Sequence, residues 1–310
     1  MSLTPTTSFV NTTVARLIED LILGAITLDR GLAELLPRKR KQISLNRFFA
    51  DGDNLTVRFP LFANATDADA MTKDEKIIDL SELQFSDTFD PVEFNLDHEF
   101  LWTQGPSVES EPSAELNAAV MSVITKNINE NLERLMWQGD TGGAGMFVLL
   151  DGFIKKIDAD VTVNSATTAG PITSANIITA LENLVAATPA EVQELSNPTI
   201  LLSHTDKYFY REAARALNFK GTNITEAVRD VFGGYPMVST QGIPAGRMFL
   251  LNAGGGEDSE LKVGTWADAD RMNVLMAKES PLDDVFGIRA RLDIGVNHVY
   301  GKQITEYSTS

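Results

Sequence analysis

The stretch WQGDTGGAG, residues 137–145, places four glycines together and is a candidate for a loop that binds phosphate. A phosphate-binding loop follows a strand and opens a helix, so that free amide groups and the positive helix end meet the anion. This stretch instead follows the longest helical pattern of the chain, and it lacks a Walker lysine and the G-x-G-x-x-G spacing. We therefore predict a structural turn built from Gly139, Asp140, Gly142 and Gly143, in which Gly139 caps the helix in the left-handed conformation.

The stretch SHTD, residues 203–206, contains the three residue types of a hydrolase triad. Neighbours this close in sequence cannot converge around one scissile bond. Ser203 or Thr205 as the N-cap of a following helix accounts for the same residues. The histidines, which are far apart in sequence and form no i, i+4 pair, are His98, His204 and His298. A histidine metal site therefore has little local support, and we predict no catalytic residue.

Three pairs of aspartates begin like the loop that binds calcium, in which the sixth position is glycine. The pairs are Asp67 and Asp69, Asp158 and Asp160, and Asp268 and Asp270. At the sixth position, counted from the first aspartate of each pair, stand Thr72, Val163 and Asn273. We interpret all three pairs as solvated turns, and we predict neither a metal nor another cofactor.

The charge of the chain is strongly acidic and unevenly placed. The 310 residues carry a net charge of −17, and residues 51–99 hold thirteen acidic side chains against three basic ones. An acidic chain has no general attraction for a nucleic-acid backbone, so such binding would need a local basic patch. The dense basic run is PRKRK, with Arg38, Lys39, Arg40 and Lys41. This run could contact packaged nucleic acid or the acidic segment of a neighbouring subunit. We give contact with a neighbouring subunit the same weight as the alternative interpretation, a solvated run of charges without a partner.

The absence of cysteine excludes disulfides, thiolate metal sites and cysteine nucleophiles. No apolar run approaches the roughly 18 residues of a membrane-spanning helix, and the N-terminus lacks the pattern of a signal peptide. We therefore expect stability to come from packing, with no signal peptide and no membrane contact.

The first hundred residues predict extended and protruding structure. Residues 1–12 predict an extended arm, and residues 16–36 repeat leucine near helical spacing, which predicts one amphipathic helix or two short ones broken at Gly24 or Gly31. Residues 54–62 and 92–102 predict two strands with an acidic excursion between them, which indicates a protruding β-hairpin. The apolar side of the second strand, which we expect to contact another subunit, carries Val92, Phe94, Leu96, Phe100 and Trp102.

The remaining two thirds predict one long helix and a mixed lobe. Apolar residues repeat every three to four positions from Leu116 to Leu135, with Ser110 or Ser113 as candidate N-cap. Helix and strand then alternate, which indicates an α/β lobe. The predicted elements are helices at residues 173–188 and 204–217, strands at residues 198–203, 235–240, 247–252 and 261–266, and a strand-rich segment at residues 273–307.

These elements, in this order, resemble the major capsid protein of tailed phages, which has the Hong Kong 97 fold. In that family the long, or spine, helix ends in a GDGTG-like turn followed by a short glycine-containing segment. The counterparts here are GDTGG at residues 139–143 and DGF at residues 151–153. Further similar segments are PTILLSHTD, VFGGYPMVSTQGIPAGRMFLLN and DDVFGIRARLDIGV. The resemblance covers residues 92–299 and is one of element order more than of spelling.

The resemblance implies an α+β capsid fold with four parts. These are an N-terminal arm and helix at residues 1–45, an extended β-hairpin or E-loop at residues 46–103, a peripheral domain with the spine helix at residues 104–160 and 281–310, and an axial domain at residues 161–280. A scaffolding domain, which many such chains carry before the hairpin, would not fit in the residues that precede it here.

The resemblance further implies a structural protein and no enzyme. Pentamers and hexamers of this major capsid protein would form an icosahedral shell around the double-stranded DNA of a tailed bacteriophage, without sequence-specific binding. Assembly would take place in the host cytoplasm, with a separate scaffolding protein, a portal and a decoration protein as further partners. Some relatives join subunits covalently through a lysine on the projection and an asparagine near the closing strands. Lys73 and Lys76 are present, but residues 285–292 contain no asparagine, so we predict no cross-link.

Three alternatives stay open at this point. An encapsulin-like nanocompartment would enclose a cargo enzyme, although such shells generally lack the long N-terminal arm predicted here. An enzyme of unknown class would use residues 200–260, where the sequence assembles no constellation of titratable residues. A surface or tail-tube protein is the third alternative.

Overall fold

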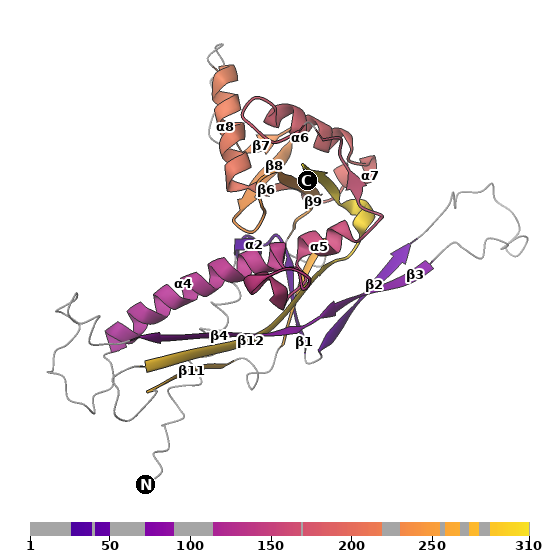
Figure 1. Cartoon of the computed structure of the whole chain (residues 1–310). Helices are drawn as coiled ribbons and strands as arrows, with labels where there is room; N and C mark the ends of the chain where they lie inside the picture. Colours follow the sequence, from indigo (N-terminus) through magenta and orange to yellow (C-terminus); the bar gives the residue numbers. More distant parts are fainter. Residues whose placement is uncertain are drawn as a thin grey trace, which may run out of the picture.

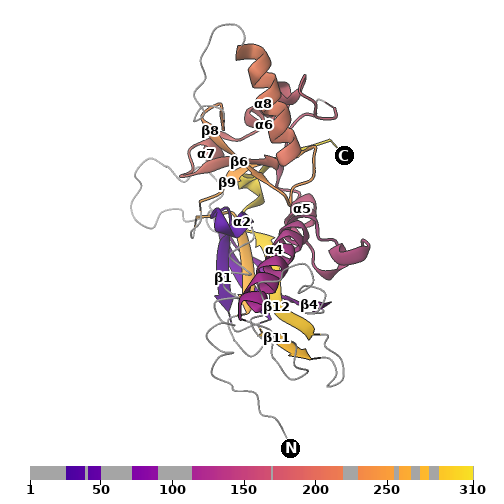
Figure 2. The same ribbon diagram turned by 90° about the vertical axis from the view of Figure 1, so that its left-hand side faces the viewer.

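The structure is a computed structural model that describes residues 26–38, 41–49, 72–89, 114–168, 170–218, 230–254, 258–266, 273–278 and 286–309. These residues form an upper and a lower lobe, each built on a sheet, and a two-stranded ribbon that projects from the lower lobe (Figure 1). Figure 2, turned by 90°, shows the same two lobes one above the other. None of the described helices is long and apolar enough to span a membrane.

The lower lobe consists of the spine helix and a five-stranded sheet. Helix α4 (Ala114–Gln138) runs along this sheet (Figure 1), and the apolar repeat that predicted it is confirmed by its buried face of Ile124, Ile128, Leu132, Leu135, Met136 and Trp137. The sheet contains β1 (Glu34–Arg38), β4 (Ser81–Phe89), β10 (Leu261–Trp266), β11 (Asn273–Lys278) and β12 (Phe286–His298). Because β12 pairs with β4, β10 and β11, it is the strand that holds this sheet together.

The upper lobe is a mixed sheet covered by helices. The six strands, in sheet order, are β5 (Asn164–Ser165), β13 (Thr305–Ser308), β9 (Arg247–Asn252), β6 (Pro198–Ser203), β8 (Tyr235–Thr240) and β7 (Val231–Phe232). Helices α6 (Ile177–Ala186), α7 (Ala190–Gln193) and α8 (His204–Asn218) belong to the same lobe. The predicted helices and strands of this α/β region are therefore confirmed. Their continuous apolar runs are explained by the burial of β6 and β9 at the centre of the sheet.

The two lobes meet around the end of the spine helix. Trp137, which is fully buried, lies with its ring centroid 5.2 Å from that of Phe153 and 5.7 Å from that of Phe249. Phe153 opens α5 (Phe153–Asp158), a short helix that follows the 3₁₀ turn η1 (Gly145–Leu149), whereas Phe249 lies in β9 of the upper lobe. A second 3₁₀ turn, η2 (Gly301–Gln303), joins β12 to β13, so the chain passes from the lower sheet to the upper one there.

The ribbon pairs β2 (Gln42–Phe49) with β3 (Thr72–Asp79) in antiparallel register, from Gln42 opposite Asp79 to Phe49 opposite Thr72. Its inner half packs on the lower sheet through a small buried cluster of Ile43, Leu45, Ile78 and Leu80. Gly264 and Gly295 are opposite each other in β10 and β12 beneath this cluster. A Cβ at Gly295 would lie 2.3 Å from the carbonyl oxygen of Asp79, so the ribbon approaches the sheet at backbone distance.

Two predictions about the first hundred residues need correction. The helical pattern at residues 16–36 forms only the short helix α2 (Ile26–Asp29) among the described residues, and Leu35 lies in strand β1. Gly31, with a φ of 62°, terminates the helical turn, and parallel pairing of β1 with β10 outweighs the local leucine spacing.

The ribbon also begins before the predicted hairpin strands. It is made by residues 42–49 and 72–79, whereas the predicted strands at residues 54–62 and 92–102 lie outside the described residues.

Sheet membership also differs from the predicted domain boundaries. The boundaries at residues 161 and 280 place β10 and β11 in the axial domain, but both strands pair in the sheet of β12. They place β13 in the peripheral domain, but β13 pairs with β9 and β5 of the upper lobe. Long-range hydrogen bonding, which a linear division of the chain does not capture, decides the membership of these strands.

Candidate functional site

The residues predicted to contact other subunits are only partly visible. Arg38 is the last residue of β1, where its backbone is opposite Trp266. Lys41 is exposed, and its carbonyl oxygen accepts a hydrogen bond of 2.9 Å from the amide of Leu80. The other predicted contact residues, Lys39, Arg40, Phe94, Leu96, Phe100 and Trp102, lie outside the described residues, as do His98 and the N-cap candidates Ser110 and Ser113.

The glycine-rich stretch is a turn whose first glycine is required by close packing. The Gly139 amide donates to the carbonyl oxygen of Leu135, 2.9 Å away, and its carbonyl oxygen accepts a 2.8 Å bond from Gly152. The left-handed cap predicted at Gly139 is wrong, because the glycine of this turn with a positive φ is Gly145, at 70°. A Cβ at Gly139 would instead lie 2.2 Å from the carbonyl oxygen of Leu150. Residue 139 is therefore glycine because the backbone of Leu150 passes too close to it to leave room for a side chain.

Two carboxylates, those of Asp140 and Asp151, lie beside this turn, so it does not form an anion-binding site. The Lys155 ammonium lies 2.6 Å from Asp140 and 2.7 Å from Asp151. The amide and hydroxyl of Thr141 donate to the same Asp151 oxygen, at 2.9 and 2.8 Å. Burial alone would raise the pKa of Asp151, but the bonds from Lys155 and Thr141 outweigh it and lower the pKa to about 2. An ionised pair of carboxylates around one lysine repels phosphate, which supports the structural reading of the glycines.

The SHTD stretch forms the cap of helix α8. The hydroxyl of Ser203 accepts a 3.0 Å bond from the amide of Asp206 and donates a 2.8 Å bond to its carboxylate. The same carboxylate accepts a 3.1 Å bond from the amide of Gly246. His204 is exposed and does not join this network. The predicted N-cap at Ser203 is therefore confirmed, and the arrangement offers no activated nucleophile.

A buried charge cluster joins the ribbon to the end of β12 and to the segment that follows α5. The ammonium of Lys76, on β3, contacts the carboxylate of Asp160 and the Nε2 of His298, which are 2.8 Å from each other. Asp160 also accepts bonds of 3.0 and 2.6 Å from the amide and hydroxyl of Thr162. Burial, and then the charge of Lys76, lower the pKa of His298 to about 4, so this histidine is neutral at pH 7.

Of the three aspartate pairs that resemble a calcium loop, Asp158 and Asp160 contact cations of the protein itself, and the other two pairs lie outside the described residues. Asp160 pairs with Lys76, and Asp158 accepts two bonds from the guanidinium of Arg247, at 3.1 and 2.7 Å. Across the described residues, no group of three or more histidine, aspartate or glutamate side chains is arranged to hold a metal ion.

The sequence analysis did not single out Glu133 on α4, whose carboxylate is buried. Its two oxygens accept bonds from the amide and the hydroxyl of Thr27, at 3.0 and 2.5 Å, and Trp137 donates a 2.8 Å bond to the same hydroxyl. Burial raises the pKa of Glu133. Helical spacing places Glu133 beside the buried residues Leu132 and Met136, and this spacing is the signal that could have identified it as a buried polar residue. The network fastens α2 to the spine helix.

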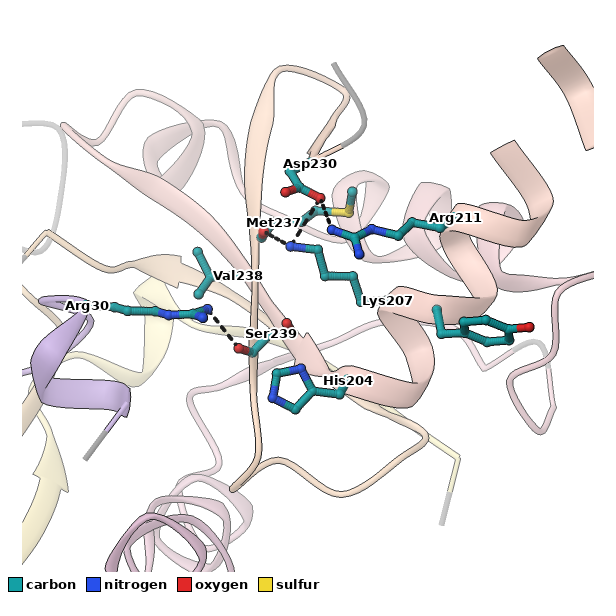
Figure 3. A pocket seen from close by; sticks show the side chains of 9 residues that line it. Arg30, His204, Lys207, Arg211, Asp230, Met237, Val238 and Ser239 are labelled. Atoms are coloured by element: carbon teal, nitrogen blue, oxygen red, sulfur yellow. Dashed lines mark hydrogen bonds and ion pairs between the residues drawn. The ribbon is translucent and has the colours of Figure 1, made fainter. Parts of the chain in front are cut away.

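A hollow of about 480 Å³ opens beside the upper lobe. Figure 3 shows its basic side chains, Arg30, His204, Lys207 and Arg211, around strand β8, together with Asp230. Sequence reasoning assigned His204 no function and did not single out the other four residues. They come from three separate parts of the chain, so only the fold brings them together.

Comparison with known proteins identifies the fold. No model of a known protein family matches the chain, and no curated protein matches it. Among solved structures, a chain of the capsid of an empty GTA particle is similar with a TM-score of 0.60 and 16% identity, covering 91% of this chain and 89% of that one. A chain of the satellite phage P4 procapsid gives a TM-score of 0.58 at 10% identity, covering 100% and 92%.

A third similar structure is a shell of another kind. A chain of the holo-SrpI encapsulin complex from Synechococcus elongatus PCC 7942 gives a TM-score of 0.55 at 11% identity, covering 100% of this chain and 92% of that one. Identities this low are informative about the fold alone. The predicted fold class is confirmed: the chain has an α+β capsid fold of the Hong Kong 97 type.

Proposed function

We propose that this chain is the major capsid protein of a tailed bacteriophage, a structural protein and not an enzyme. Its pentamers and hexamers assemble into an icosahedral shell that encloses double-stranded DNA. The observation that supports this proposal is the similarity of nearly the whole chain to capsid chains, at 91% coverage of this chain for the GTA particle and 100% for the P4 procapsid.

The ribbon gives this proposal a physical basis. Among the described strands, β2 and β3 pair only with each other, and a two-stranded ribbon is marginally stable in water on its own. Its inner half is secured by Ile43, Leu45, Ile78 and Leu80, whereas its outer half leaves the body (Figure 1). Ile77, on the face opposite the cluster, is 44% exposed. A neighbouring subunit that covers this face of the ribbon would bury Ile77, which this chain leaves partly in solvent.

The predicted contacts and domain roles form part of the same proposal. The basic residues Arg38–Lys41 would meet an acidic segment of a neighbour, and the apolar residues at 94, 96, 100 and 102 would pack in the same interface. The upper lobe would take the axial position and the lower lobe the peripheral one. A separate scaffolding protein, a portal and a decoration protein would be the other partners, with assembly in the host cytoplasm and no covalent cross-link between subunits.

The enclosed DNA would be confined without specific contacts. The net charge of −17 opposes general adhesion of a phosphate backbone to this chain. DNA retention in such a shell would therefore depend on closure of the wall and not on affinity of the subunit.

Particle formation by the full chain tests the proposal directly. The protein is expressed alone and together with a candidate scaffolding protein, and is studied by electron microscopy and light scattering. We expect closed shells or capsomers with fivefold and sixfold symmetry. A small oligomer that persists in both preparations would refute the capsid function and favour an enzyme that uses residues 200–260.

A second candidate is an encapsulin-like nanocompartment shell. It is supported by the similarity to the encapsulin chain, which covers 100% of this chain. Both candidates predict closed shells, so the contents decide between them. Shells from the native source that hold double-stranded DNA would identify the capsid, and shells that hold a protein cargo would identify the nanocompartment.

A further inference from the structure

The hollow of about 480 Å³ lies where three elements meet. Arg30 follows helix α2, and His204, Lys207 and Arg211 lie on one face of helix α8 at a spacing of three to four residues (Figure 3). Tyr208 of the same helix also lines the hollow. The opposite wall is the β8 segment from Met237 to Ser239. β7 pairs with β8 at Tyr235 and Pro236, and the Met237 amide donates a 2.7 Å bond to the carbonyl oxygen of Asp230. Beyond Met237, no described strand pairs with the outer edge of β8.

The charges in this hollow do not cancel. Lys207 and Arg211 share a single carboxylate, that of Asp230, at 3.1 and 3.2 Å. Arg30 has no carboxylate partner within the described ranges, and its guanidinium donates to the carbonyl oxygen of Ser239, 3.0 Å away. With His204 neutral, the charged side chains of the lining are three cations and one carboxylate, a net charge of +2. This is a local excess of positive charge on a chain of net charge −17.

The cations are held in place before any ligand arrives. Lys207 donates a 3.2 Å bond to the carbonyl oxygen of Met237, two residues before the Ser239 carbonyl that Arg30 engages. Both side chains are therefore fixed against the edge of the same strand, and Arg30 keeps further N–H donors for a ligand. Pre-positioned donors lose less conformational entropy when an anion binds.

The state of His204 agrees with a positive local potential. Its pKa is lowered, first by burial and then by the charges of Arg30 and Lys207. An anion that enters the hollow would offset those two charges and raise the pKa of His204. His204 would then be protonated and would donate a hydrogen bond to the ligand in addition to Arg30 and Lys207.

We propose that this hollow binds the phosphate group of a phosphorylated small molecule. A phosphate monoester carries about −1.5 to −2 charges at pH 7, which matches the surplus of the lining, and guanidinium groups bind phosphate oxygens in bidentate geometry. The volume is of the size that holds a complete small ligand, larger than phosphate alone. Tyr208, which is 60% exposed at the rim, offers an aromatic face to the organic part of that ligand. This site is independent of shell formation.

Isothermal titration of the full chain, in whichever assembly state it adopts, tests the site with inorganic pyrophosphate and with adenosine monophosphate at constant ionic strength. We expect one binding event per chain with each probe. The Arg30→Gln variant, which leaves the Asp230 ion pairs intact, should weaken both probes about tenfold or more, the effect of losing a charged hydrogen bond. Arg215→Gln is the matched control. Arg215 is an exposed arginine of helix α8, which supplies Lys207 and Arg211 to the hollow, but Arg215 does not line the hollow itself.

His204→Gln provides a second variant if Arg30→Gln does not fold. Protonation of His204 should make the ratio of the wild-type to the variant affinity for pyrophosphate rise between pH 8 and pH 6, because the protonation of pyrophosphate itself affects both proteins equally. A constant ratio would remove His204 from the site. Tyr208→Ala should weaken adenosine monophosphate and leave pyrophosphate unchanged, which would establish the contact with the organic part.

The outcomes that overturn the proposal are distinct from failure of shell assembly. Absence of binding by both probes, or equal weakening by Arg30→Gln and Arg215→Gln, would refute the site. Loss of assembly in Arg30→Gln without phosphate binding in the wild type would also refute it, since the hollow would then be a contact between subunits. Electron microscopy of the same samples reports shell formation separately.

Discussion

In the upper lobe, β6 and β9 each have a neighbouring strand on both edges, and they are buried along nearly their whole length. In the ribbon, β2 and β3 pair only with each other among the described strands, and their buried apolar cluster lies in the half that packs on the lower sheet. The first region satisfies its hydrogen bonds and buries its apolar surface within one chain. The ribbon leaves strand-edge hydrogen bonds and part of its apolar surface for a neighbouring subunit to satisfy. Substitutions in the two regions should therefore affect different properties, stability in one and assembly in the other.

The largest effect on stability is expected where the lobes meet. Trp137→Ala removes a fully buried ring that lies against Phe153 and Phe249 and donates to Thr27. We expect a loss of about 3–5 kcal/mol in the free energy of unfolding, as for other large-to-alanine changes in a core. Chemical denaturation followed by circular dichroism measures it.

The matched control is Val123→Ala, on the same helix but 69% exposed, which should change stability by less than about 0.5 kcal/mol. If Trp137→Ala cost no more than this control, the two lobes would not share a core at that point.

The next effect is a dependence of stability on pH at the ribbon base. The pKa of His298 is about 4 in the folded protein against an ordinary value of 6.5, so the unfolded chain binds the extra proton between these values. Stability from this group is complete above pH 6.5 and is lost as the pH falls towards 4, by about 3 kcal/mol. The charge of Lys76 reinforces the shift, and the contact with Asp160 opposes it.

Glu260 works in the opposite direction and must be removed to see this effect. Burial raises its pKa to about 7 from 4.5, so its contribution stabilises the fold as the pH falls through that window. The comparison is therefore Glu260→Gln against Glu260→Gln with His298→Gln, each unfolded at pH 7 and at pH 4. The single variant should lose more stability on acidification than the double variant, and equal losses would contradict the buried neutral histidine.

A smaller effect is expected at the turn after the spine helix. Gly139→Ala places a Cβ 2.2 Å from a carbonyl oxygen of Leu150, and relief of this clash should cost about 1–3 kcal/mol. Gly142→Ala serves as the control, because its Cβ would meet only the Asp140 carboxylate, at 3.4 Å. Thermal unfolding of the two variants gives the comparison. Similar melting temperatures for both would show that the turn adapts and that close packing does not require glycine at residue 139.

The smallest effect on the subunit should accompany the largest effect on assembly. Replacing Arg38, Lys39, Arg40 and Lys41 by glutamate should change the unfolding free energy of the subunit by less than about 1 kcal/mol. Lys41, the residue of this run whose side chain is described, is exposed, and exposed charges contribute little to stability. Shell yield, counted by electron microscopy, should fall severely if this run meets an acidic neighbour. An unchanged yield would eliminate charge complementarity as the basis of assembly.

Long, regular patterns were predictable, and long-range pairing was not. The apolar repeat from Ile124 to Leu135 and the buried runs of β6 and β9 identify their elements because local sequence decides them. β1 was assigned to a helix, because its pairing with β10 joins residues more than 200 positions apart.

The same limit applies to the sites. The cap at Ser203 was predictable because it acts over three residues. The contact of Glu133 with Thr27 spans 106 positions, and the hollow collects side chains from the residue after α2, from α8 and from β8. No local pattern carries such contacts.

The close approach of Gly295 to the backbone of Asp79 has a mechanical consequence. Where side chains separate two layers, they can change rotamer and absorb a displacement, but here backbone presses on backbone. The ribbon is therefore stiffly joined to the lower sheet at this point. Movement of the ribbon would act on β12, which is hydrogen-bonded to three other strands of the lower sheet. A force applied at the outer end of the ribbon would be transmitted to this sheet as strain instead of being lost at the joint.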